Sequence, residues 1–359
     1  MSYKQYYAYT TDGDSRCPQM NCIAHASQTD CVRSLQWSPD GTFISSITDT
    51  NVLQIHSTTN LTLHQSIPHP STLNAYAWYP YMTSADPATC CLATCVRDQP
   101  LHLRDSNTGM VRASYSACTP HDEILTPRAV AFSGYTGLLA GYSGWTANFD
   151  VHRQGAPSIM EKVPGIVSCI APGAETLGLT AWTTFAGHIS LRSNSLEEAL
   201  LWRMPEELGG SQGIMHCAWA PDMQTLWTAT RGTRKHLVAW DIRNVRQPLL
   251  ALSKPVVGAS QLRTQFAFDQ AGRYLVVGSA DRPGYVDVHD LVEMGEQVGS
   301  IEAHRDLVVG MAAHPEKPLL ATSSGQRHFN QDEEEIEDYS LRIWSVAASY
   351  YPYAEIFCE

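Results

Sequence analysis

Short apolar runs that end in an aromatic residue recur along the chain, each followed by a turn of the Pro-Asp-Gly kind and a second apolar run. The first such unit reads SLQWSPDGTFISSI from Ser34. Related units begin at Ala75, Ala129, Ser168, His216, Gln265 and Gly310. Apolar and polar residues alternate within many of the runs, which is typical of β-strands and not of helices. The sequence therefore predicts an all-β protein built from repeats.

The spacing of the units indicates the architecture. The equivalent positions are Trp37, Trp78, Phe132, Ile170, Trp219, Phe268 and Ala313, and their mean spacing is 46 residues over the six intervals. A four-stranded WD-repeat blade takes about 40–45 residues, and loop insertions account for the excess. Each unit closes on a third strand, beginning at Leu53, Leu101, Ala147, His188, Leu237, Tyr285 and Leu341. We therefore predict a seven-bladed WD-repeat β-propeller over residues 31–346.

A propeller must pair the outer strand of its last blade, because an unpaired strand edge promotes aggregation. We expect a terminal segment to close the ring in this way. Residues 1–30 contain KQYYAYT from Lys4, and residues 347–359 form a short tail. The N-terminal segment is the favoured source of the closing strand. It has no apolar signal region, so secretion is not expected.

Composition limits the possible functions. Of the 359 residues, 43% are hydrophobic and 17% charged, which suits a folded globular protein. The formal net charge of -12 gives no overall attraction to nucleic acid or to an anionic membrane. No stretch approaches the roughly 20 apolar residues of a membrane span. Any RNA binding therefore requires basic groups that are concentrated on one face.

Catalytic and metal-binding patterns are missing from the sequence. The ten cysteines include no C-x-x-C pair, and several lie in apolar runs, so we interpret them as reduced, packed thiols without a metal. Gly141–Gly144 does not form a nucleophile elbow, and Gly209–Gly213 lacks the lysine of a phosphate-binding loop. We expect no cofactor and no enzymatic activity.

Positive charge gathers at the strand ends of one face. In blades whose strands run a, b, c, d outward, the b-to-c turns and d-to-a connections share a face. These segments carry Arg33, Arg97, Arg128, Arg231, Arg234, Lys235, Arg263, Arg282, Arg305 and Arg327, together with the aromatic residues Trp145, Phe185 and Tyr285. Arginines hold phosphates while exposed bases stack on rings, as looped RNA requires. Asp98, Asp122, Glu123 and Asp281 share the face, so a merely solubilising role is the alternative.

Two other features admit a different interpretation. Trp240-Asp241-Ile242-Arg243 has the W-D-x-R form with which substrate receptors of ubiquitin ligases dock their adaptors, and Arg243 would lie on the opposite face. A protein-interaction propeller is therefore the alternative function. The acidic run from Asp332 to Asp338 is expected to be a solvated loop, with a docking segment for a basic partner as the alternative.

Several stretches are more specific than a general blade pattern. They are WSPDGTFISSITDTNVLQI from Trp37, the insertion at Ser84–Pro87, RDQPLHLRDSNTGMVRASY from Arg97, HDEIL from His121, Trp240–Arg243, LLATSSGQRHF from Leu319 and the closing LRIWSV. With them the chain resembles the telomerase Cajal body protein family over about residues 31–344. The resemblance implies a seven-bladed propeller that binds small nucleolar-type and Cajal-body RNAs, including telomerase RNA in animals, through a short loop motif. Short fungal members are linked to pre-mRNA splicing and small nuclear ribonucleoproteins.

The resemblance and the basic face together predict an RNA-binding scaffold for small nuclear or Cajal-body ribonucleoproteins. It would act in the nucleus, in Cajal bodies or the nucleoplasm, with the cytoplasm as a further location, as a monomer within a larger complex and without a membrane. The residues expected to contact RNA are Arg97, Arg128, Trp145, Phe185, Arg231, Arg234, Lys235, Arg263, Arg282, Gln326 and Arg327.

Overall fold

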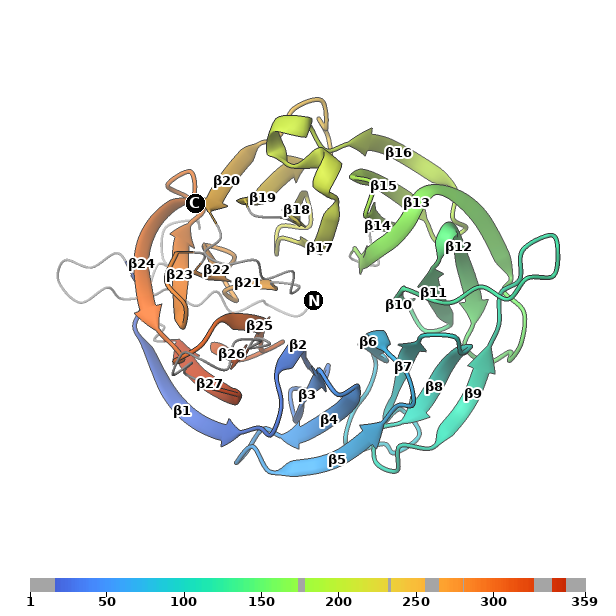
Figure 1. The fold of residues 1–359 in the computed structure, drawn as a ribbon, viewed down its shortest axis with the longest axis horizontal. Coiled ribbons are helices and arrows are strands. Elements are labelled where there is room, and N and C mark those ends of the chain that lie inside the picture. The colour runs from blue at the N-terminus through green and yellow to red at the C-terminus, as the bar shows by residue number, and fades with distance from the viewer. Residues whose placement is uncertain are drawn as a thin grey trace, which may run out of the picture.

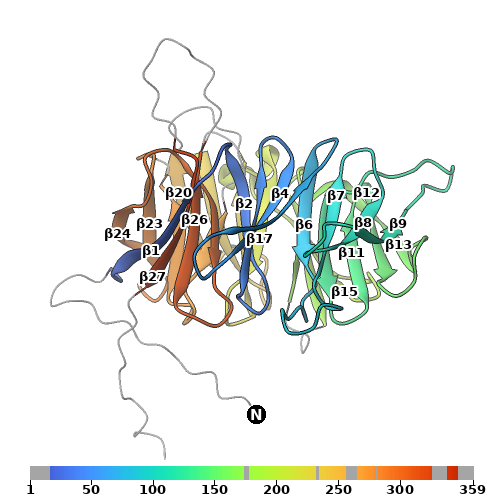
Figure 2. The same ribbon diagram turned by 90° about the horizontal axis from the view of Figure 1, so that it is seen from below.

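The computed structural model describes residues 17–173, 178–231, 234–255, 265–279, 281–325 and 338–346. These residues form antiparallel sheets arranged around a ring, which is seen face-on in Figure 1 and edge-on in Figure 2. Two single-turn 3-10 helices, η1 (Glu206–Leu208) and η2 (Gly210–Gln212), are the helical elements of this part of the chain. The prediction of an all-β propeller is confirmed.

Four of the sheets contain four strands that are consecutive in the chain. The first holds β2 (Val32–Trp37), β3 (Phe43–Thr48), β4 (Val52–Ser57) and β5 (Leu63–Pro68). The second holds β6 (Leu73–Trp78), β7 (Cys91–Val96), β8 (Leu101–Asp105) and β9 (Val111–Tyr115). Farther along lie β17 (Ile214–Trp219), β18 (Thr225–Thr230), β19 (Arg234–Asp241) and β20 (Leu250–Pro255). The next holds β21 (Phe266–Phe268), β22 (Tyr274–Gly278), β23 (Tyr285–Asp290) and β24 (Glu296–Glu302).

A seven-stranded sheet occupies the middle of the chain. Its strands are β10 (Ala129–Ser133), β11 (Gly137–Gly141), β12 (Ser143–Asp150), β13 (Ile159–Pro172), β14 (Leu179–Thr184), β15 (His188–Ser193) and β16 (Glu198–Arg203). The long strand β13 pairs with β12 through its first half, up to Ile166, and with β14 from Val167 onward. The single strand β13 therefore connects the group β10–β12 to the group β14–β16 without a turn between them.

The remaining four-stranded sheet joins the two ends of the described chain. It contains β25 (Val308–Ala313), β26 (Leu319–Ser324) and β27 (Ser340–Val346), and β1 (Met20–Ser27) lies outside β27. The pairing runs from Met20↔Val346 to Ser27↔Ser340. The outer strand therefore comes from the N-terminal side of the chain, but from Met20–Ser27. The earlier segment from Lys4 lies outside the described residues.

Indole groups at the ends of innermost strands hold neighbouring sheets together. Trp37 donates from Nε1 to the carbonyl of Ala312 at 2.9 Å, which joins the sheet of β2 to that of β25. Trp219 likewise donates to the carbonyl of Ala171 at 2.9 Å, between β17 and β13. These two aromatic residues were aligned from sequence as equivalent, and both are buried. Truncating such a buried tryptophan to alanine typically costs about 3–5 kcal/mol of stability.

A buried polar network fixes the last sheet. Trp344 donates from Nε1 to the hydroxyl of Thr322 at 2.8 Å, and this hydroxyl lies 2.7 Å from Nε2 of His304. The other ring nitrogen of His304 lies 2.9 Å from the hydroxyl of Ser340. Asp338 stands beside His304 and accepts a hydrogen bond from the backbone N–H of Arg305 at 2.8 Å. The network ties the connection before β25 to β26 and β27.

This network corrects one prediction about the acidic run. Asp338, its last residue, has a side chain only 11% exposed and lies 3.7 Å from the guanidinium of Arg342. Asp338 therefore stabilises the fold through these contacts and is not part of a solvated loop. Residues 332–337 lie outside the described residues.

Candidate nucleic-acid interface

A repeated backbone hydrogen bond sets the position of the turns on the face with the predicted basic residues. In the second sheet the N–H of Arg97, the first residue after β7, donates to the carbonyl of Thr72 at 2.8 Å. Phe185, after β14, donates to Ile166 at 2.9 Å, and Arg231, after β18, donates to Gly213 at 2.9 Å. Arg97, Phe185 and Arg231 therefore hold equivalent places, each where a second strand ends beside the innermost strand.

Arg97 is available to a phosphate. Its side chain is 59% exposed, and its Nε lies 3.5 Å from Oδ2 of Asp98, which is 75% exposed. An ion pair this exposed typically contributes about 0–1 kcal/mol, because water and salt screen it. A phosphate oxygen can therefore compete with Asp98 for the guanidinium at small cost.

The turn that carries Phe185 is held in a crowded position. Gly213 adopts a φ of 87°, and a Cβ built on it would lie 2.3 Å from the carbonyl oxygen of Phe185. The same glycine accepts the hydrogen bond from Arg231, so one residue contacts both predicted RNA-binding positions. The ring of Phe185 is half-buried. The structure thus brings the backbones of an aromatic and a basic candidate together.

Trp145 already has a cationic neighbour. Its half-buried ring packs against a hydrophobic cluster shared by the first two sheets and its own, and Nζ of Lys162 lies 5.4 Å from the ring centroid. The two residues are paired across β12 and β13. Sequence reasoning missed Lys162, because only the strand register places it beside Trp145. A base that stacked on this ring would lie close to a lysine.

Arg128 and Arg282 are held differently. The N–H of Arg128 donates to the carbonyl of Gly141 at 2.7 Å, and the side chain is half-buried. The carbonyl of the preceding residue, Pro127, accepts a hydrogen bond from the side chain of Asn74. Asn74 lies two residues after Thr72, which accepts the N–H of Arg97. Arg282 is exposed and lies 4.8 Å over the ring of Tyr285, in a cation–π contact.

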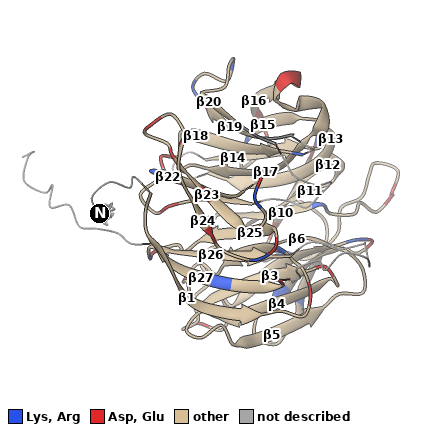
Figure 3. Ribbon diagram, turned by 60° about the vertical axis from the view of Figure 1, so that its left-hand side comes forward, with Lys and Arg blue, Asp and Glu red and all other residues tan. Residues whose placement is uncertain are grey.

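Not every predicted cation contributes to this surface. Arg33 donates to the carbonyl of Thr48 and to the side chain of Asn51, both at 3.0 Å, so its role is structural. Arg263, Gln326 and Arg327 lie outside the described residues, as do the side chains of Arg234 and Lys235. Charges of both signs occupy the connections between strands (Figure 3), and exposed Asp122 and Glu123 interrupt the basic surface.

On the opposite face, two residues of the W-D-x-R motif, Asp241 and Arg243, bind each other within the turn that follows β19. Arg243 donates to both carboxylate oxygens of Asp241, with Nη2 2.7 Å from Oδ2 and Nε 2.9 Å from Oδ1. These hydrogen bonds lower the pKa of Asp241 to about 2. Trp240 is buried and donates to the hydroxyl of Thr228 at 3.1 Å. The structure therefore gives the motif a local role in the turn.

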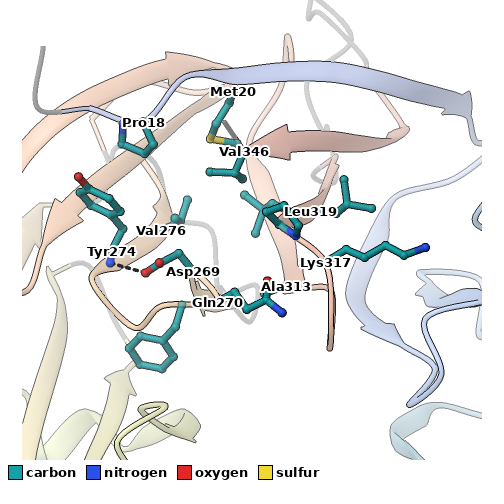
Figure 4. A pocket seen from close by; sticks show the side chains of 13 residues that line it. Pro18, Met20, Asp269, Gln270, Tyr274, Val276, Ala313, Lys317, Leu319 and Val346 are labelled. Carbon is teal, nitrogen blue, oxygen red and sulfur yellow. Dashed lines mark hydrogen bonds between the residues drawn. The ribbon is translucent and has the colours of Figure 1, made fainter. Parts of the chain in front are cut away.

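A small apolar pocket lies between the sheet of β21–β24 and that of β25–β27, beside the start of β1 (Figure 4). Asp269 is the carboxylate in its lining, and its oxygens accept hydrogen bonds from the backbone N–H groups of Ala271 and Tyr274. The carboxylate of Asp269 therefore stabilises the turn after β21.

Over the described ranges, no cluster of three or more His, Cys, Asp or Glu residues could hold a metal ion. Within the same ranges, no helix has the length and apolar character to span a membrane.

Comparison with known proteins agrees with the repeat and with the resemblance. The model of the WD domain, G-beta repeat, matches residues 16–55. The Telomerase Cajal body protein 1 homolog of Drosophila melanogaster is 30% identical over 85% of this chain and 59% of its own length. The Telomerase Cajal body protein 1 of Homo sapiens is 30% identical over 88% of this chain and 61% of its own.

A shorter relative is similar over most of both lengths. The Guanine nucleotide-binding protein negative regulator 1 of Schizosaccharomyces pombe is 24% identical over 88% of this chain and 86% of its own. The chain spans about three fifths of the length of the telomerase Cajal body relatives. It is a WD-repeat protein homologous to the telomerase Cajal body proteins.

Proposed function

We propose that this protein is a non-enzymatic scaffold that binds a small nuclear or Cajal-body RNA and its ribonucleoprotein partners in the nucleus. The names of the telomerase Cajal body relatives support a role of this class. The scaffold is a closed seven-bladed ring, with the sheet of β10–β16 counted as two blades that share β13. The contacts of β2 with β25 and of β1 with β27 support the closure.

The observation that carries the proposal is the equivalence of Arg97, Phe185 and Arg231. The same backbone hydrogen bond fixes all three at the inner edge of one face, where Asp49 and Gly325 hold the equivalent places in other sheets. Two guanidinium groups and an aromatic ring therefore share this edge. Such a surface suits single-stranded RNA, because cationic side chains bind its phosphates and aromatic rings stack on its exposed bases.

Roles for the individual residues follow from their chemistry. Arg97, Arg128, Arg231 and Arg282 bind phosphates, and Trp145 and Phe185 stack on bases. Arg234, Lys235, Arg263, Gln326 and Arg327 belong to the same proposal on the sequence pattern alone. The WD-repeat match and the names of the telomerase Cajal body relatives support the non-enzymatic assignment.

The test is ultraviolet crosslinking and sequencing of RNA that is bound to the protein in cells. The parent protein should enrich a small nuclear RNA class. A variant with Arg97→Glu and Arg231→Glu should lose that enrichment, whereas Arg246→Glu, which reverses an exposed charge in the turn of Arg243 on the opposite face, should keep it. The proposal is wrong if the parent enriches no RNA class. Loss of enrichment in Arg246→Glu alone would assign binding to the other face.

A further inference from the structure

Two cysteines from neighbouring innermost strands meet in the core between the sheets. Sγ of Cys169, in β13, lies 3.7 Å from the carbonyl oxygen of Cys217, in β17. The hydroxyl of Thr183 lies 3.8 Å from Sγ of Cys217 and 3.5 Å from the carbonyl oxygen of Cys169. Neither cysteine takes part in a disulfide, and Cys169 packs against the hydrophobic cluster that contains Cys217.

The two thiols differ in access to solvent. Cys217 is 3% exposed, whereas Cys169 is only partly buried. Hydrogen bonding to the thiol of Cys169, together with burial, raises the pKa of Cys217, so Cys217 is a poor first nucleophile. A small oxidant would therefore react with Cys169 first.

We propose that Cys169 and Cys217 form a reversible disulfide when the folded protein meets a peroxide. The sulfur of Cys169 attacks one peroxide oxygen and becomes a sulfenic acid, while the O–O bond breaks and a first water leaves. The sulfur of Cys217 then attacks the sulfenic sulfur and loses its proton, and a second water leaves as the S–S bond forms. The two thiols lose two electrons in total, and the peroxide accepts them.

The bond would join two parts of the ring directly beneath the predicted RNA-binding turns. β13 holds the turn of Phe185 through Ile166, and Gly213, just before β17, holds Arg231. Figure 1 shows the second half of β13 reaching inward toward β17. The disulfide would close a loop between residues 48 positions apart, which constrains the unfolded chain and should raise the melting temperature by a few degrees.

The test uses the purified, folded full chain without RNA, so its outcome does not depend on the proposed function. After treatment with hydrogen peroxide, thiol blocking and digestion, mass spectrometry should detect a crosslinked peptide that joins Cys169 to Cys217. Dithiothreitol should remove the crosslink and return the melting temperature to that of the untreated protein.

Single-cysteine variants test the order of the steps. In Cys217→Ser, or in Cys217→Ala if the serine destabilises the core, dimedone should trap a sulfenic acid at Cys169. In Cys169→Ser, dimedone should not label Cys217. The proposal is overturned if peroxide joins other cysteines instead, if no crosslink forms while exposed Cys22 and Cys118 are oxidised, or if Cys217 is the labelled residue.

Discussion

The carbonyl of Gly213 accepts the N–H of Arg231 at 2.9 Å. The same glycine, with φ 87° and ψ 167°, lies against the carbonyl of Phe185. Only glycine adopts this backbone conformation without strain, and no side chain fits in the space. The spacing of the two RNA-binding candidates therefore depends on a residue that touches no RNA in the proposal.

Replacing Gly213 by alanine should lower stability by about 3 kcal/mol or more, because backbone strain and a contact at 2.3 Å with Phe185 add together. Urea unfolding measures the loss. Gly144→Ala is the matched control, since Gly144 also has positive φ but its added Cβ would meet nothing within 4 Å. It should cost only about 1 kcal/mol. Equal losses would show that the contact with Phe185 does not matter.

Removing a phosphate-binding arginine should make RNA affinity less sensitive to salt. Each lost contact with a single strand lowers the slope of log affinity against log salt by about 0.7, because fewer counterions are released. We expect this change for Arg97→Ala and for Arg231→Ala, measured by fluorescence anisotropy with a small nuclear RNA loop. Arg246→Ala should leave the slope unchanged. Unchanged slopes in Arg97→Ala and Arg231→Ala would remove these two arginines from the phosphate-binding surface.

Trp145→Ala should weaken RNA binding by about 1–3 kcal/mol if a base stacks on its ring. The salt slope should stay the same, because no phosphate contact is lost. Lys162→Ala provides the contrast, since it removes the cation 5.4 Å from the same ring and should lower the slope. A Trp145→Ala variant that binds as the parent does would exclude stacking there.

Stability should fall as the pH drops below about 6.5, because several buried histidines are neutral in the folded protein. Burial lowers the pKa of His304 to about 3 and that of His56 to about 4. The unfolded chain, with histidine pKa values near 6.5, then binds more protons than the folded chain, so protonation favours unfolding. Each such histidine contributes up to about 1.4 kcal/mol per pH unit between 6.5 and its folded pKa.

Urea unfolding between pH 7.5 and pH 4.5 measures this dependence. His304→Gln should be less stable than the parent at pH 7.5, since its hydrogen bonds with Thr322 and Ser340 change, but its stability should fall less steeply with acid. A slope as steep as that of the parent would show that His304 does not carry the pH dependence.

The strand pattern could be predicted from sequence where one face of a strand is buried. Trp37 and Trp219 mark the ends of innermost strands because these positions must pack against the next sheet. Outer strands face solvent on much of their surface, so β1 carries little pattern and its place at Met20–Ser27 could not be predicted. The continuity of β13 was also missed, since the fourth repeat was placed only from Ser168, whereas the strand begins at Ile159 and continues through Gly165, which has a positive φ.

The candidate site was predictable in part. The position of Arg97, Phe185 and Arg231 on one face follows from strand order alone. Their equivalence in the backbone hydrogen bond depends on contacts between residues far apart in sequence, and so does the approach of Lys162 to Trp145. Asp338 was misjudged because its six acidic or apolar predecessors suggested a solvated loop, whereas its partners come from two separate segments, the connection before β25 and the strand β27.

Asp338→Ala should destabilise the fold by about 1–3 kcal/mol, because the backbone N–H of Arg305 loses its acceptor. The carboxylate also faces Arg342 and accepts from Ser340. Burial alone would raise the pKa of Asp338, but these hydrogen bonds and the neighbouring Arg342 hold it below the ordinary value. Its contribution is therefore present above about pH 4 and is lost as the pH falls further.

Deletion of residues 331–337, which leaves Asp338 in place, is the comparison, and thermal unfolding at pH 7 measures both variants. We expect the deletion to retain the parent's melting temperature within a few degrees, because shortening a loop changes its closure entropy little. Asp338→Ala should melt several degrees lower than the parent. If the deletion proved the more damaging change, the acidic run itself would contribute to the fold.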